Sequence, residues 1–171
     1  MEWYGWAGRI IRVDLTRGKI SVQELPRDLA LNFLGGAGIN AKILYDEVGP
    51  EVDPFSPENR LIFGFGPLCG TIALSSAKFM VTAKSPIFNA FGDSSCGGHF
   101  GTEVKFAGYD HIIFQGASKK PVYLWIDDDH VELRDATHLW GMDVWETDRT
   151  LKEEHGAVSY THLTLPTTER V

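Results

Sequence analysis

The chain has 171 residues, 43% of them hydrophobic and 12% aromatic, with a formal net charge of −7. This length is typical of a single domain, and the composition is too apolar for a disordered segment. The acidic balance argues against a nucleic-acid groove, because such grooves bind by neutralising phosphates with basic side chains.

The first half of the chain predicts a β-hairpin followed by two helices. Alternating apolar residues over 9–15 and 19–25 favour two strands joined by a turn at Gly18, which accepts positive φ at little cost. Asp28 is expected to cap a short helix that ends at Gly35 and Gly36. Helical spacing of apolar residues then predicts a second helix over 38–48, followed by a proline-rich loop.

The second half predicts further strands without regular strand–helix alternation. Short apolar or alternating runs favour strands at 60–66, 78–84, 111–115, 122–126 and 130–134. A Gly/Ser-rich stretch at 92–101 is expected to separate the second of these from a helical turn at 102–107, and 140–154 predicts a closing helix. Because the strands come in pairs, the predicted fold class is α+β.

The chain end differs from the rest. From about Ala157 onward the sequence has neither the periodicity nor the turn residues of the preceding domain. We therefore expect a domain over 1–156 and a non-native tail over 157–171 that carries no function.

Three motifs suggest chemistry only weakly. Residues 36–41 (GAGINA) match a dinucleotide fingerprint, but the segment before them predicts a helix rather than the required strand, so two abutting helix ends are the preferred interpretation. Cys96 and His99 have metal-ligand spacing, and Cys69 and His111 could join them, yet nothing in the spacing supports a four-ligand zinc site or a Cys/His nucleophile. The acidic run 127–129 could bind calcium, although a solvated hairpin turn is the simpler interpretation.

A better candidate site combines residues 75–78 (SSAK) with 93–98 (DSSCGG). Gly97 and Gly98 allow close approach to the backbone, whose amides before the next helical turn could face an anion. The serine hydroxyls add donors, and Lys78 adds a compact positive charge suited to phosphate. The alternative is a plain Gly-rich connection with Lys78 on a solvated face.

Many short blocks in order resemble the N-terminal domain of the aldehyde ferredoxin oxidoreductase family. The likeness extends from Trp6 to about Gly156, and the blocks are GRIIRVDLTRG (8–18), FLGG (33–36), DPFSPEN (53–59), GPLCGT (66–71), KSP (84–86), GGHFG (97–101), KFAGYD (105–110), KPVY (120–123), RDA (134–136) and HLWG (138–141).

The resemblance implies a tungsten or molybdenum enzyme in which two pyranopterin dithiolenes hold the metal and a magnesium ion bridges their phosphates. A neighbouring [4Fe–4S] cluster passes electrons to ferredoxin while an aldehyde is oxidised to a carboxylate. The N-terminal domain of the family is a two-sheet base beneath the pterin. A [4Fe–4S] cluster needs about four thiolates, and this chain has two cysteines. The resemblance therefore implies an incomplete two-sheet domain that is inactive alone.

Carried over residue by residue, the basic pterin contact of the family falls on Lys78, where arginine is typical. The segment whose asparagine carbonyl helps to hold magnesium falls on Ser95, Cys96, Gly97 and Gly98, with Ser95 in place of the asparagine. Lysine keeps the charge but loses bidentate geometry, whereas a backbone carbonyl survives the change at Ser95. No catalytic residue is assigned to this stretch.

Two other functions remain open from the sequence: a non-catalytic anion- or nucleotide-binding module that uses the same Gly-rich loops, and a structural or oligomerisation domain. Exposed strand edges on an incomplete sheet would favour a homo-oligomer. No apolar run reaches the length of about 20 residues that a membrane span needs, and the start lacks a leader pattern. Low cysteine usage fits the cytoplasm.

Overall fold

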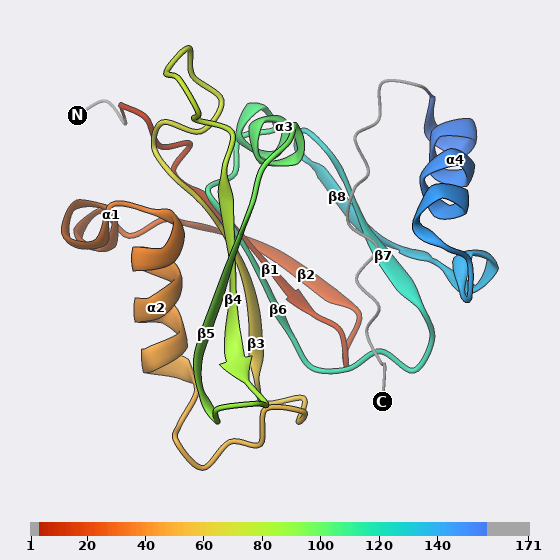
Figure 1. Ribbon diagram of the computed structural model, residues 1–171, viewed down its shortest axis with the longest axis horizontal. Coiled ribbons are helices and arrows are strands. Elements are labelled where there is room, and N and C mark those ends of the chain that lie inside the picture. The colour runs from red at the N-terminus through yellow and green to blue at the C-terminus, as the bar shows by residue number, and fades with distance from the viewer. Residues whose placement is uncertain (1–3, 157–171) are drawn as a thin grey trace.

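The computed structural model describes residues 4–156, which form a six-stranded sheet, a two-stranded sheet and the helices that cover them (Figure 1). The elements in chain order are β1 (Arg9–Asp14), β2 (Lys19–Glu24), α1 (Arg27–Phe33), α2 (Gly36–Glu47), β3 (Arg60–Phe65), β4 (Phe79–Ser85), β5 (Ala90–Cys96), α3 (Phe100–Phe106), β6 (His111–Gln115), β7 (Val122–Asp127), β8 (His130–Asp135), the 3₁₀ helix η1 (Thr137–Leu139) and α4 (Val144–His155). The α+β class is confirmed.

The large sheet has the strand order β2-β1-β6-β3-β4-β5. Its one parallel pair is β1 with β6, and the other neighbours are antiparallel. The predicted hairpin β1–β2 is present, with Gly18 at φ 61° in its turn. β6 lies between β1 and β3, so it joins the hairpin to the later strands and makes this one sheet.

Alternation along the inner strands gives the large sheet two apolar faces. Ile10, Ile62 and Ile113 point to one face, where Ile39 and Ile43 of α2 cover them. Figure 1 shows α1 and α2 together on this side of the sheet. Both the period of two in the strands and the helical period in α2 are therefore used for burial.

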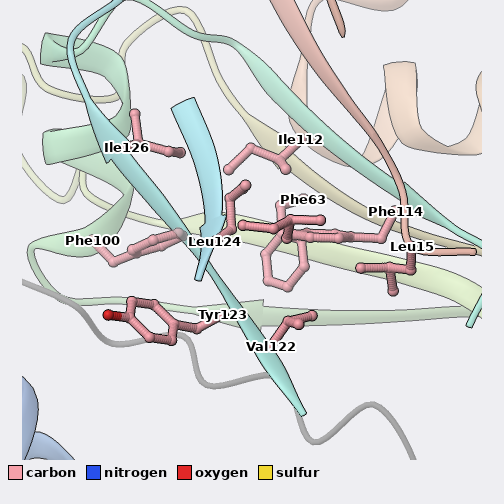
Figure 2. Close-up of a pocket in the computed structure, with 10 residues that line it drawn as sticks. Leu15, Phe63, Phe100, Ile112, Phe114, Val122, Tyr123, Leu124 and Ile126 are labelled. Carbon is pink, nitrogen blue, oxygen red and sulfur yellow. The ribbon is translucent and has the colours of Figure 1, made fainter. Parts of the chain in front are cut away.

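The β7–β8 hairpin covers the opposite face of the large sheet. Leu124 and Leu133 of the hairpin pack on a core that includes Phe63 and Phe114. A small cavity of about 40 Å³ remains between the layers, and Figure 2 shows the apolar side chains that surround it. The Tyr123 hydroxyl instead forms a hydrogen bond of 2.9 Å with His155 Nε2.

Two anchors hold peripheral segments on this framework. Lys84 of β4 is 6% exposed, and its ammonium donates to the carbonyl oxygens of Gly49, Pro50 and Val52 at 3.2, 2.7 and 2.6 Å. It thereby holds the loop after α2 against the sheet. At the other end of the chain, α4 begins with a capping box at Asp143 and packs through Leu151 on the hairpin.

Several details differ from the sequence-based expectations. Asp28 lies in the first turn of α1 and forms no cap, because the helix begins one residue earlier, after Pro26. The Gly/Ser-rich stretch expected to be a connection contains strand β5. The closing helix begins at Val144 rather than residue 140, since η1 and a turn occupy 137–141. The proposed tail 157–171 lies outside the described residues.

Candidate functional site

The structure brings Lys78 next to the segment from Ser95 to Gly98. β4 and β5 are antiparallel, and Phe79 at the start of β4 pairs with Cys96 at the end of β5. Lys78 therefore precedes one member of this pair while Gly97 follows the other, so the two are close across the ends of the strands. Figure 1 shows this end of the β4–β5 hairpin beside α3.

These residues lie at the surface rather than in the core. Lys78, Ser95, Cys96, Gly97 and Gly98 are all exposed. A Cβ built on Gly97 or on Gly98 would meet no atom within 4 Å, and Gly98 has φ of 101°, a conformation that favours glycine. The backbone at both positions therefore borders open space that a ligand could enter, with a lysine beside it.

Two hydroxyl groups in the loop before Lys78 form hydrogen bonds within that loop. The Ser76 hydroxyl donates to the Thr71 carbonyl oxygen at 3.0 Å, and the Thr71 hydroxyl donates to Leu68 O at 2.7 Å. Ser75 is exposed, with φ of 61°. The serine hydroxyls expected as anion donors thus differ, because Ser76 shapes the loop whereas Ser75 faces solvent.

A polar chain that the sequence analysis did not find runs from α2 to β5. Asn40 donates to the Thr82 hydroxyl oxygen at 3.0 Å, and that hydroxyl donates to Asp93 Oδ1 at 2.6 Å. Asn40 and Thr82 are completely buried, whereas Asp93 is exposed. Asp93 lies two residues before Ser95 on β5, so this series of hydrogen bonds ends next to the candidate site.

The zinc hypothesis receives no support from the described part of the chain. No group of three or more His, Cys, Asp or Glu side chains among residues 4–156 could hold a metal ion. Cys69 is buried, and that burial raises the pKa of its thiol, which disfavours a thiolate ligand. His111 is completely buried on β6, and burial lowers its pKa to about 4.

Two other motifs have structural roles. The segment 36–41 begins α2 directly after α1, so the strand that a dinucleotide fingerprint requires is absent from that position. In the acidic run 127–129, Asp129 forms an ion pair with Arg9 at 2.5 Å. Across residues 4–156, no helix is long and apolar enough to cross a membrane.

Comparison with known proteins matches most of the chain to one family. Residues 10–165 match the family described as aldehyde ferredoxin oxidoreductase, N-terminal domain. The chain is 47% identical to the tungsten-containing aldehyde ferredoxin oxidoreductase of Pyrococcus furiosus over 154 residues, which are 90% of this chain and 26% of that protein. The enzyme of the same name from Thermococcus kodakarensis is 46% identical over 90% of this chain and 26% of its own length.

A solved structure gives the same result for the fold. The active-site complex BamBC of benzoyl coenzyme A reductase with 1,5-dienoyl-CoA superposes with a TM-score of 0.86 at 47% identity, covering 88% of this chain and 23% of that one. The aliphatic sulfonate oxidoreductase WOR-like subunit of Pyrococcus furiosus is 42% identical over 88% of the chain. The chain spans about a quarter of the length of the two aldehyde ferredoxin oxidoreductases named above.

Proposed function

The chain belongs to the aldehyde ferredoxin oxidoreductase family as its N-terminal domain, and from this premise we propose that it holds the pterin phosphates of a tungsten or molybdenum cofactor. The observation that supports this most directly is the position of Lys78 beside Ser95–Gly98 across the β4–β5 strand ends. Lys78 and Ser95–Gly98 are common to the site expected from side-chain chemistry and to the site implied by the family resemblance.

The residues present fit a phosphorylated group bound with a divalent cation. The Lys78 ammonium would pair with a phosphate, and the open space at Gly97 and Gly98 leaves room for it to approach the backbone. The Ser95 carbonyl oxygen would face magnesium, a hard cation that prefers oxygen ligands. When bound, the metal–pterin group supplies two-electron redox chemistry, and this domain supplies its binding and orientation.

In the whole protein, we propose that an aldehyde and water yield a carboxylate, three protons and two electrons, and that ferredoxin accepts the electrons. A [4Fe–4S] cluster, where bound, would supply one-electron transfer between the two. The cluster ligands and the groups acting on substrate would belong to parts of the protein outside this domain, so the chain alone would be catalytically inactive. Similarity to the benzoyl coenzyme A reductase complex equals that to the aldehyde enzyme, 47% in both cases. We therefore propose that parts of the protein outside this domain set the substrate choice.

Calorimetric titration of the chain with magnesium pyrophosphate, which stands for the two cofactor phosphates, tests this proposal. Lys78→Ala should weaken binding about tenfold or more, because a charge-assisted contact is lost. Lys19→Ala on the exposed strand β2 is the matched control and should bind like the wild type.

Equal affinities for the two variants would refute the site. Adenine nucleotides serve as a further ligand in the same titration. Tighter binding of ATP than of pyrophosphate would favour the alternative, a nucleotide-binding module without a pterin role.

A further inference from the structure

We infer that Asn40, Thr82 and Asp93 form a positioning device that fixes the register of strand β5 and so places Ser95–Gly98 beside Lys78. This inference rests on the proposed function for its consequence, since the segment that it positions is the proposed phosphate-binding segment. None of the three residues contacts the ligand in this scheme, so they are positioning residues rather than catalytic ones.

The need for such a device follows from the character of β5. It is one of the two edge strands of the large sheet, and each of its seven residues is exposed or half-buried. Apart from Phe91, which is half exposed, its residues are small or polar, so no buried face selects one pairing with β4. Register is weakly specified in such strands, and a shift by two residues would move β5 by about 7 Å.

The four-residue turn from Pro86 to Asn89 sets the register at one end of the hairpin only. Ser85 and Ala90 pair there, whereas Phe79 and Cys96 pair at the opposite end, beside the candidate site. The Thr82–Asp93 pair lies midway between these ends. A contact at that point fixes the register of β4 and β5 in the half of the hairpin that lies between the turn and the candidate site.

The contact is partly buried, and Asn40 holds its buried partner, Thr82. Thr82 Oγ1 donates to Asp93 Oδ1 at 2.6 Å and accepts from Asn40 Nδ2 at 3.0 Å. Because the Asn40 amide supplies the proton on that side, the Thr82 hydroxyl proton is directed at the carboxylate. Within residues 4–156, this is the one side-chain hydrogen bond that links β5 to another strand.

Asn40 is held in place by the sheet beneath it. Its amide nitrogen also lies 3.4 Å from Ile62 O and 3.3 Å from Met80 O, carbonyl oxygens of β3 and β4. A Cβ on Gly64 of β3 would lie 2.2 Å from Asn40 Oδ1, so only glycine leaves room for this side chain. The Asn40 side chain thereby connects α2, β3 and β4 to the exposed strand.

Hydrogen–deuterium exchange of the chain, followed by mass spectrometry, tests the positioning role. Thr82→Val keeps the side-chain shape and removes the hydroxyl, and it should speed exchange in residues 90–98 about tenfold or more, because a hydrogen bond to a charged group is lost. Exchange in β6, at the centre of the sheet, should not change. Thr82→Ser restores the hydroxyl and should restore slow exchange. Ser94→Ala, which removes a β5 hydroxyl that makes no side-chain hydrogen bond within residues 4–156, is the matched control and should exchange like the wild type.

Two results would overturn the inference: wild-type exchange of 90–98 in Thr82→Val, or an equal acceleration in β6, which would indicate general destabilisation. Magnesium pyrophosphate titration of the same variants separates this inference from the proposed function. Loss of affinity in Thr82→Val with rescue in Thr82→Ser supports both. Faster exchange in residues 90–98 with no pyrophosphate binding by the wild type supports the positioning role and refutes the phosphate site.

Discussion

The Lys105 ammonium donates to the Asp110 carboxylate at 2.5 Å, and the two side chains are only 8% and 0% exposed. Asp110 also accepts the backbone amides of Ala7 and Gly8 at 3.1 and 2.6 Å. Lys105 belongs to α3, whereas Asp110 immediately precedes β6. A single buried carboxylate therefore joins the start of the chain to α3 and to the centre of the large sheet.

Removing the charge of Asp110 should be costly. Asp110→Asn leaves the Lys105 ammonium buried without its counter-charge, so the free energy of unfolding should fall by about 3–5 kcal/mol in urea titrations. The control is Asp46→Asn, which breaks an ion pair with Lys42 on the surface of α2 and should cost about 0.5 kcal/mol. Equal losses in the two variants would show that the buried pair is not a structural anchor.

The free energy of unfolding should decrease as the pH is lowered, because of His111. Burial lowers its folded-state pKa from 6.5 to about 4, with nearby Lys105 acting in the same direction and Asp110 opposing it. The unfolded chain therefore binds more protons between these values, and stability present above pH 6.5 is lost progressively down to about pH 4, by about 3 kcal/mol in total. Urea unfolding at pH 4.5–7 measures this slope. His111→Leu should flatten it, and an unchanged slope would assign it to other groups.

Gly97 offers a test that separates folding from binding. Because a Cβ at this position meets no atom within 4 Å, Gly97→Ala should change the unfolding free energy by no more than about 0.5 kcal/mol. The added methyl group would occupy the space proposed for a phosphate, so magnesium pyrophosphate should bind more weakly. Thermal unfolding measures the stability of the variant, and calorimetry measures its affinity for magnesium pyrophosphate. Unchanged affinity would mean that no ligand approaches the backbone there.

The cavity between the two layers should accept one more methylene group. Val122 of β7 lines it, and Val122→Ile should stabilise the chain by about 0.5–1 kcal/mol, the value of one buried CH₂. Val131→Ile on β8 is the control, since Val131 packs on the core without lining the cavity. Denaturant midpoints compare the two, and a loss of stability in Val122→Ile would show that the layers are already closely packed.

The sequence predicts those strands and helices whose buried faces carry a regular pattern of apolar residues. β1 and β3 are predictable because apolar side chains mark their buried faces, and Gly18 marks the first turn. β5 is not predictable in this way, because a strand exposed on both faces carries no such pattern and its residue types are common in loops. The parallel pairing of β1 with β6 joins residues about 100 positions apart, which no local signal encodes.

The candidate site was predicted only in part. The chemistry of Lys78 and Gly97 suggested that they act together, but the reason they are neighbours is the pairing of Phe79 with Cys96. That pairing depends on the strand that was missed. The link from Asn40 to Asp93 draws on three elements, so it could not be found from spacing along the chain.

The burial of Lys84 makes it a built-in reference for chemical footprinting. Its amine is enclosed by three carbonyl oxygens, so acylating reagents should reach it far more slowly than the exposed amine of Lys78. Both lysines lie on or beside the same strand and experience the same global unfolding. A ligand that shields Lys78 would therefore slow the labelling of that amine, while the slow labelling of Lys84 would stay the same.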